Sequence, residues 1–417
     1  MDGERHADAS VGAGAVISLL SYCVSTFAGL AITVLAVRTI GATEFGNWQL
    51  ATTVGTYVAI LANPALDRFG IRELGREKLS HLRRFTMQNI FSLQLLGVSS
   101  VALLAVALGY LLQQRYGLAP VIGMGIAGQT VRSMYPEWTA VSLNRIPTAA
   151  LLMAAGPVGT LCAFLMLRSW LVASSVTLGA ASLAGGAFAI ILAIATMRHS
   201  VVPSRASLRS AGYRDIVAGA RTLAAGRLFG LLAINFDYLV VYFLLSPTAL
   251  TQYALCYKAV SVAQGVAVVA QNPLASWLGS MKTEERWSAL TIVIALSAFL
   301  GLLLVGTVGG LGLLVIPTIF PTGSVPTTVF LVLLIGVAIQ TVNAGVGTWL
   351  LMTPSASDLH RPQLAAAGCA LIISPVAVSL SGLPGAAAAT LVGSIASTMA
   401  TFRLVKSCRG TRGPAYY

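Results

Sequence analysis

Runs of apolar residues separated by short polar segments repeat along the whole 417-residue chain. Each run has about 20 residues or more, the length that an α-helix needs to cross a bilayer. The pattern predicts an all-α integral membrane protein with twelve spanning helices, at 13–37, 48–66, 88–112, 117–136, 147–167, 171–197, 218–245, 250–272, 288–316, 326–352, 363–381 and 384–404. The links between them are too short to fold as separate domains, so any function is expected in the helix bundle or at its faces.

The positions of Lys and Arg give these helices an orientation, because cytoplasmic loops of membrane proteins collect positive charge. With the N-terminus in the cytoplasm, the external turns carry only Arg38, Arg115 and Arg168. The expected parts are a cytoplasmic N-terminal segment (1–12), an N-terminal six-helix lobe (13–197), a basic cytoplasmic link (198–217), a C-terminal six-helix lobe (218–404) and a basic cytoplasmic tail (405–417).

The composition narrows the class of protein further. Hydrophobic residues make up 56% of the chain and charged residues only 9%, which excludes a soluble, disordered or disulfide-rich protein. The formal charge of +13 would favour nucleic acid as a partner in a soluble protein, but here the loop topology explains it, so no nucleic acid is expected. The five cysteines form no CxxC pair and the histidines lie in polar segments, so we expect neither a metal site nor a cofactor.

An internal similarity links the two halves of the chain. Residues 42–51 (ATEFGNWQLA) align with residues 247–256 (PTALTQYALC), so that Trp48 matches Tyr253. Each segment connects an odd-numbered expected span to the next one. The spacing predicts a parallel repeat, in which a pseudo-two-fold axis along the membrane normal relates two six-helix lobes.

Two prolines occupy matching positions in this repeat. Pro157 lies in the fifth expected span and Pro375 in the eleventh. Proline-interrupted helices at corresponding positions often mark the binding site of a transporter. Ordinary packed kinks explain the two prolines equally well, so both interpretations stay open.

Four segments resemble bacterial polysaccharide and O-antigen flippases, and together they extend along most of the chain. They are FAGLAITVLAVRTIGATEFGNWQLATTV (27–54), MYPEWTAVSLNRI (134–146), FDYLVVYFLLSPTALTQYALCYKAV (236–260) and VIPTIFPTGSVPTTVFLVLLIG (315–336). The chain departs from the family pattern at Val37, where Ala is common, and at Thr251, where Gly is usual. The resemblance implies the polysaccharide-transporter branch of the multidrug/oligosaccharidyl-lipid/polysaccharide flippase superfamily, whose members have two six-helix lobes around a central cavity.

Two residues of opposite charge lie inside neighbouring expected spans, where each charge costs about 2.5–3.5 kcal/mol and therefore suggests a function. Asp237 and Lys258 are both about 12 Å from the outer ends of their antiparallel helices, so we expect them to form an ion pair. The pair would either hold the C-terminal lobe together or loosen during transport, coupling it to protons or to an anionic substrate.

Two arginines lie in the inner halves of their expected spans, Arg227 in the seventh and Arg132 in the fourth. If they face a central cavity, they make it positive, which suits a pyrophosphate because arginine pairs with two phosphate oxygens at once. The alternative is that both side chains extend to the cytoplasmic headgroups.

Uncharged polar residues in the spans are weaker candidates. They are Gln340, Asn343, Asn235 and Gln129. Gln340 and Asn343 are three residues apart and hence on one helix face. Such side chains can bind sugar hydroxyls, although hydrogen bonding across helices is their commoner use.

Motifs of enzymatic chemistry are missing or misplaced. Gly123, Gly125 and Gly128 spell GxGxxG, but they lie inside an expected span with no preceding strand. Close helix packing explains them better than dinucleotide binding. The sequence has no P-loop, HExxH or GxSxG motif, and no long external loop such as a polymerase would use, so we expect no catalytic residue.

The resemblance implies a bacterial inner-membrane flippase without enzymatic activity. It would move a polyprenyl-pyrophosphate-linked oligosaccharide from the cytoplasmic to the outer leaflet by alternating access, for surface polysaccharides such as O-antigen or exopolysaccharide. Its partners would be this lipid-linked glycan, the lipid bilayer, and polysaccharide polymerase and other assembly proteins. The alternatives are a cation-coupled multidrug exporter of the same superfamily, a lipid II flippase, and an integral-membrane polysaccharide polymerase or ligase.

Overall fold

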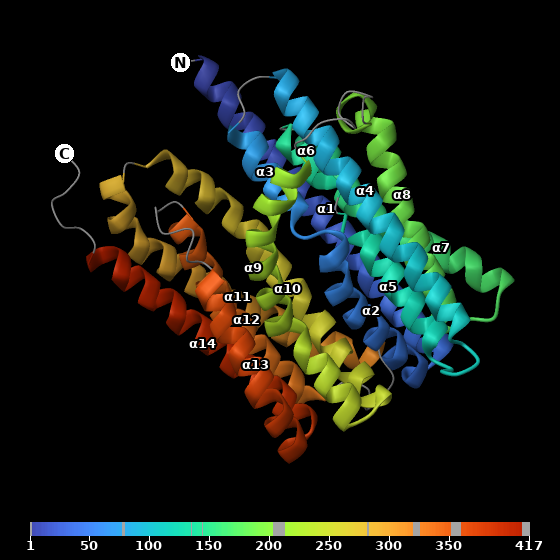
Figure 1. Ribbon diagram of the computed structural model, residues 1–417. Helices are drawn as coiled ribbons and strands as arrows, with labels where there is room; N and C mark the ends of the chain where they lie inside the picture. Colours follow the sequence, from blue (N-terminus) through green and yellow to red (C-terminus); the bar gives the residue numbers. More distant parts are fainter. Residues whose placement is uncertain are drawn as a thin grey trace. The chain divides into compact units, whose positions relative to one another are not determined.

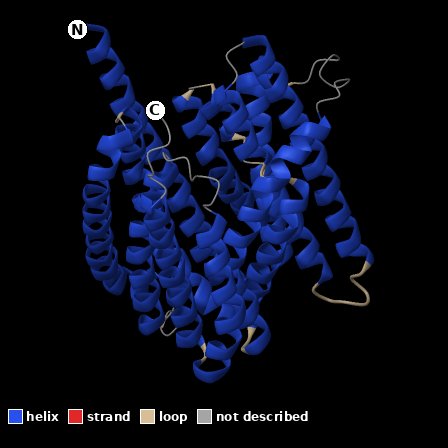
Figure 2. Cartoon of the chain, turned by 60° about the vertical axis from the view of Figure 1, so that its left-hand side comes forward, coloured by secondary structure: helices blue, strands red, loops and turns tan. Residues whose placement is uncertain are grey.

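The computed structural model describes residues 2–76, 80–134, 136–143, 145–202, 213–281, 283–319, 326–351 and 360–410. Within these ranges the chain is mostly helical, with short loops and no strand (Figure 2), in agreement with the expected all-α class. The chain divides into two compact units, residues 1–228 and 229–417. The division falls inside a single helix, α9 (Tyr213–Leu244).

Unit 1 is a helical bundle with α5 among its inner helices. Its helices are the first half of α9 and α1 (Asp2–Ile40), α2 (Ala42–Ala62), α3 (Leu66–Arg76), α4 (Ser80–Leu111), α5 (Ala119–Arg132), α6 (Glu137–Ser142), α7 (Ile146–Trp170) and α8 (Ser175–Val201). α5 packs against α2, α4 and α8 (Figure 1). Gly125 lies against α2, Gly123 against α4 and Gly128 against α8, so closely that an added Cβ would come within 3.0 Å of a neighbouring atom. The helix packing predicted from this glycine pattern is therefore confirmed.

Unit 2 contains the second half of α9 and five further helices. They are α10 (Pro247–Ser280), α11 (Thr283–Ile319), α12 (Thr327–Leu351), α13 (His360–Ser381) and α14 (Leu383–Gly410). α13 packs against α14, and α12 packs against α10, α11 and α14. The Ser246 hydroxyl caps α10 by accepting a hydrogen bond from the Ala249 amide at 3.0 Å. Gly382 joins α13 to α14 with a φ of +65°, a conformation that glycine adopts without strain.

Nine helices of the described residues are long and apolar enough to cross a membrane: α1, α4, α7, α8, α9, α11, α12, α13 and α14. α2 and α10 carry more polar residues, and α5 has only 14 residues, fewer than the expected span 117–136. α5 ends at Arg132 and α6 begins after Pro136. The total of twelve spans stays a prediction.

The two ends of unit 1 carry loops that the predicted topology assigns to different sides of the membrane. The start of α1, α3 and α6 lie at one end, and the loop between α4 and α5 lies at the other (Figure 1). The described parts of the basic segment, 67–76 and 80–87, and the α4–α5 loop that contains Arg115 are therefore at opposite ends of unit 1. Other parts of the topology prediction fall outside the described residues: Lys78, Lys282, residues 203–212 of the basic link and residues 411–417 of the tail.

Residues matched by the internal repeat have similar surroundings in their own units. Trp48 in α2 is buried in unit 1, and Tyr253 in α10 is buried in unit 2. Pro157 lies inside α7 and Pro375 inside α13, the fifth and eleventh expected spans. This correspondence is what a parallel repeat would produce, and the repeat itself stays a prediction.

Candidate functional site

Unit 2 contains a cavity of about 340 Å³, lined by residues of α9, α10, α12, α13 and α14. Its polar lining consists of uncharged side chains, namely Tyr257, Gln264, Gln340, Thr341, Asn343, Gln363, Thr390, Ser394 and Ser397. The volume lies within the range of about 300–1,000 Å³ that is typical of small-molecule sites. Two of the predicted site residues, Gln340 and Asn343, therefore face the same cavity.

A chain of amide and hydroxyl groups crosses one side of this cavity. The Gln264 amide donates to Gln340 Oε1 at 2.7 Å, and the Gln340 amide donates to Ser394 Oγ at 2.9 Å. The hydrogen bonds thus connect α10 to α12 and α12 to α14. Gln340 bonds across helices, as the commoner use of such residues predicts, and at the same time lines the cavity.

Asn343 makes a second connection one helical turn further along α12. Its amide nitrogen donates to Ser397 Oγ at 3.0 Å, and its carbonyl oxygen accepts a hydrogen bond from Thr401 Oγ1 at 2.6 Å. Both partners belong to α14. Because both polar atoms of the amide are held, its orientation toward the cavity is fixed before any ligand binds.

Asp237 lies beside this cavity and is only 3% exposed. Its carboxylate accepts hydrogen bonds from the hydroxyl of Tyr253, from Thr390 Oγ1 at 2.9 Å and from the Tyr238 amide at 2.9 Å. Thr390 is itself a lining residue, so a single hydroxyl separates the carboxylate from the cavity. Hydrogen bonds from neutral donors offset part of the cost of burying a charge.

The predicted ion pair between Asp237 and Lys258 is wrong. Within the described part of the chain, the hydrogen-bond donors to the carboxylate come from Tyr253, Thr390 and Tyr238, and Lys258 is not among them. Helix geometry explains this result. Tyr253 faces Asp237, and Lys258 follows it by five residues, which turns its side chain by about 140° around α10. The prediction rested on equal depth in the membrane, which does not fix the helix face.

A second group of charged residues lies in unit 1. Arg227 Nη1 is 3.0 Å from Asp67 Oδ1, and both side chains are largely buried. Glu137, at the start of α6, is near enough to Asp67 and Arg132 to interact with both electrostatically. Burial raises the pKa of the Glu137 carboxyl from 4.5 to about 7, and Asp67 adds to the rise, whereas a backbone hydrogen bond and Arg132 oppose it.

The other predicted site residues have separate positions. Arg132 ends α5 and its side chain is exposed. Gln129 is half-buried in the same helix and lies close to Gly55 of α2. Asn235 is half-buried in α9 and is not a lining residue of the unit 2 cavity. The structure therefore brings Gln340, Asn343 and Asp237 together and leaves the remaining candidates elsewhere.

A buried polar network supports the charged group of unit 1. The Trp138 indole donates to Gln94 Oε1 at 2.9 Å, and the Gln94 amide donates to Asn63 Oδ1 at 3.3 Å. Asn63 ends α2 and its side chain also donates to the carbonyl of Ser133, just after α5. This network holds the ends of α2 and α5 against α4 and α6, and so positions Glu137 next to Trp138.

The analysis of the sequence missed several of these residues. Tyr253 was visible as the partner of Trp48 in the repeat, and its spacing of four from Tyr257 indicates a shared face on α10. Asp67 and Glu137 gave no comparable signal, because both lie outside the apolar runs. Ser and Thr on α14 are frequent in membrane helices, so nothing in the sequence singles out Thr390 or Ser394. Among the described residues, no cluster of three or more His, Cys, Asp and Glu side chains could hold a metal ion.

Comparison with known proteins adds a family and a fold. A sequence profile described as "Polysaccharide biosynthesis protein" matches residues 11–273, more than half of the chain. No curated protein matches the sequence. Similar solved structures include the multidrug transporter DinF-BH, at 12% identity and a TM-score of 0.68, with 95% of this chain and 94% of that chain covered.

Two further structures have comparable similarity. The lipid II flippase MurJ, in an inward closed conformation, has a TM-score of 0.64 at 12% identity, over 94% of this chain and 87% of its own. An inward-facing multidrug resistance transporter of the MATE family and MOP superfamily has a TM-score of 0.63 at 13% identity, over 96% of this chain and 100% of its own. At these identities the likeness establishes the fold alone.

Proposed function

Because the chain belongs to the polysaccharide biosynthesis protein family, we propose that it is a flippase for a polyprenyl-pyrophosphate-linked oligosaccharide. It carries this lipid-linked sugar from the cytoplasmic to the outer leaflet of a bacterial inner membrane by alternating access of two lobes. Both chain termini lie in the cytoplasm. The product enters a surface polysaccharide such as O-antigen or exopolysaccharide, through a polymerase and other assembly proteins.

The family match carries this proposal, and the cavity in unit 2 supports it. Its lining of uncharged amides and hydroxyls offers both donors and acceptors, as a sugar hydroxyl requires. We assign Gln340 and Asn343 to sugar binding, with Asn235 and Gln129 as further contacts along the path.

The pyrophosphate needs cationic groups during its passage. Arg227, Arg132 and Lys258 are our candidates, because arginine in particular binds phosphate oxygens in pairs. Arg227 is held by Asp67 at 3.0 Å, so its role requires that this ion pair opens when the substrate enters. The protein performs no covalent step in this proposal.

Depletion of the protein in its native host tests the proposal. We expect completed lipid-linked repeat units to accumulate on the cytoplasmic leaflet while the surface polymer is lost. Gln340→Leu should reproduce the accumulation. Gln363→Leu changes another glutamine of the same lining, and the comparison shows whether the effect is specific to Gln340. Depletion without accumulation would refute the proposal.

A cation-coupled multidrug exporter is the second candidate, and one observation favours it. Asp237 is a buried acid whose described hydrogen bonds all come from neutral donors, which leaves its charge available for a proton or a cation. In that case Asp237→Asn should abolish drug efflux, depletion should increase sensitivity to cationic drugs, and lipid-linked sugars should stay at their normal level.

A further inference from the structure

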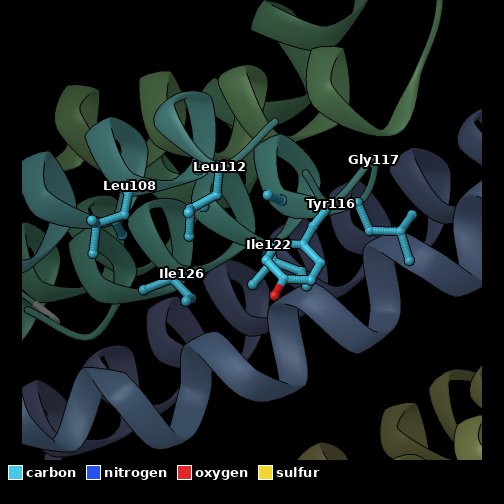
Figure 3. Close-up of a pocket in the computed structure, with 11 residues that line it drawn as sticks. Leu108, Leu112, Tyr116, Gly117, Ile122 and Ile126 are labelled. Carbon is cyan, nitrogen blue, oxygen red and sulfur yellow. The ribbon is translucent and has the colours of Figure 1, made fainter. Parts of the chain in front are cut away.

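Unit 1 contains a groove that the proposed transport path does not use. It has a volume of about 550 Å³ and lies between the C-terminal half of α4, the loop that follows, and α5 (Figure 3). Leu108 and Leu112 border it from α4, and Ile122 and Ile126 border it from α5. The leucines are exposed on the surface of unit 1, so the groove opens toward the surroundings of the helix bundle.

Small residues form the floor of this groove and fix its shape. An added Cβ at Gly109 would lie 2.8 Å from the carbonyl oxygen of Ala119, and one at Gly123 would lie 2.5 Å from that of Ala105. The two helix backbones therefore touch along the floor, while the leucine and isoleucine side chains rise on both sides. Backbone contact of this kind is rigid, so the groove exists before a ligand arrives.

One end of the groove carries a polar group and a positive charge. Tyr116 lines the groove, and the guanidinium carbon of Arg115 is 5.6 Å from the centre of its ring. Tyrosine and arginine are typical of the level of the lipid headgroups. In the proposed orientation this end faces the outer side of the membrane, and the groove extends inward along α5 to Ile126, about 10 Å from Ala119.

These features match a ligand with one long apolar chain and an anionic head. We propose that the groove binds the isoprenoid chain of a polyprenyl phosphate or pyrophosphate, with the phosphate beside Arg115, at the outer leaflet. This inference rests on the proposed function, which supplies the lipid carrier. A diacyl phospholipid has the same type of head but carries two chains, whereas the groove is a single channel along α5.

The site would hold the carrier by its tail while the sugar leaves the cavity. A substrate that crosses the membrane keeps its chain in the hydrocarbon throughout, so it needs a place beside the bundle rather than inside it. The groove meets this need because it is apolar along its length and charged only at the expected outer end. Arg115 then has a role beyond its contribution to topology.

Photolabelling of the purified protein in nanodiscs tests the inference. The probe is a polyprenyl monophosphate with a diazirine in its first isoprene units, and mass spectrometry locates the labelled peptides. We expect labelling within residues 105–126. Gly117 lines the groove and has no atom within 4 Å of an added Cβ, so Gly117→Trp should fill the groove without disturbing the fold and lower labelling about tenfold. Arg115→Gln should weaken binding about fivefold.

Matched variants separate these effects from general ones. Gly29→Trp is the control for the added side chain, since Gly29 also has no atom within 4 Å of an added Cβ and does not line the groove. Arg168→Gln is the control for charge, since Arg168 is another exposed arginine at a predicted external turn. Both should label like the unchanged protein.

Competition identifies the ligand class. Unlabelled polyprenyl phosphate should compete with the probe, and diacyl phosphatidylglycerol should compete at least tenfold less well. Equal competition by the two lipids, or unchanged labelling in Gly117→Trp, would overturn the inference. The proposed function is measured separately, by the accumulation of lipid-linked sugar in cells. If the proposed function is wrong, no sugar accumulates but the groove is still labelled. If the groove does not bind the carrier, labelling fails but sugar still accumulates.

Discussion

At the scale of single residues, the hydrogen-bond donors and acceptors around a buried polar group determine its environment. Asp237 is surrounded by hydroxyls and a backbone amide, and Tyr253, Tyr238 and Tyr257 pack against one another beside it. The carboxylate thus depends on tyrosine for its hydrogen bonds, where the sequence indicated a lysine. Charge alone could not identify the partner, because the sequence does not give the rotation of α10.

Tyr253→Phe should destabilise the protein through the loss of this hydrogen bond. The aromatic packing stays, but the buried carboxylate loses a donor, which costs about 1–3 kcal/mol. Thermal unfolding in detergent measures the change. Tyr110→Phe is the control, because Tyr110 is 51% exposed, and its substitution should change stability by less than about 0.5 kcal/mol. Equal stability of the two variants would show that Asp237 does not need Tyr253.

Glu137 should make the stability of the protein depend on pH. Its pKa in the folded protein is about 7, above the usual 4.5, so the folded state binds more protons than the unfolded chain between these values. Stability should therefore fall as the pH rises from about 4.5 to 7, by an amount on the order of 1–3 kcal/mol, and this group should add no further change above that range.

Glu137→Gln provides the comparison for this pH dependence. The amide does not titrate, so the variant should lose much of the change in unfolding temperature between pH 5 and pH 8 and should be the more stable protein at pH 8. Glu285→Gln is a suitable control, because Glu285 lies in the first turn of α11, in the other unit. An identical pH profile for Glu137→Gln and the unchanged protein would contradict the assignment.

At the scale of helices, small residues determine how closely the elements of unit 1 approach. Gly123, Gly125 and Gly128 place α5 against α4, α2 and α8. The sequence predicted this packing because the glycines lie inside an apolar run, where helix contact is their usual role. The expected span 117–136 ended at this break, but hydropathy did not show that α5 stops earlier, at Arg132, or that the short helix α6 follows Pro136.

Gly125→Ala should lower the stability of unit 1. An added Cβ would lie 2.5 Å from the side chain of Ala51 and 2.7 Å from its backbone, so α2 and α5 must separate, at a cost of about 1–3 kcal/mol. Gly29→Ala is the matched control within the same unit, because an added Cβ there has no atom within 4 Å. Unfolding temperatures in detergent compare the two, and equal values would refute the packing argument.

At the scale of the whole molecule, the sequence identifies the helices more readily than the residues that share a cavity. Apolar runs identified nearly all helices, because each must satisfy its own backbone hydrogen bonds in lipid. Which residues share a cavity depended on helix rotation, which hydropathy does not contain. Gln340 and Asn343 were found because a spacing of three places them on one face, whereas Thr390 and Gln264, on other helices, required the fold.

The proposed topology can be tested with cysteine labelling in intact cells. Gly117→Cys, in a chain whose other cysteines are replaced, lies in the expected external loop and should react with a membrane-impermeant maleimide. A second variant keeps Cys408, near the end of α14, as its single cysteine, and this residue should react only after permeabilisation, because the tail is expected in the cytoplasm. The reverse pattern would invert the orientation and place the groove of unit 1 at the inner leaflet.

Helix α9 is held by side-chain contacts at two points along its length, its two anchors. Arg227 holds its first half to Asp67 of unit 1 at 3.0 Å, and Asp237 holds its second half to Tyr253 and Thr390 of unit 2. About 15 Å of helix separates the two anchors. Because α9 continues without a break from one unit into the other, each half of this helix is fastened within a different unit, and the turns between residues 227 and 237 belong to both.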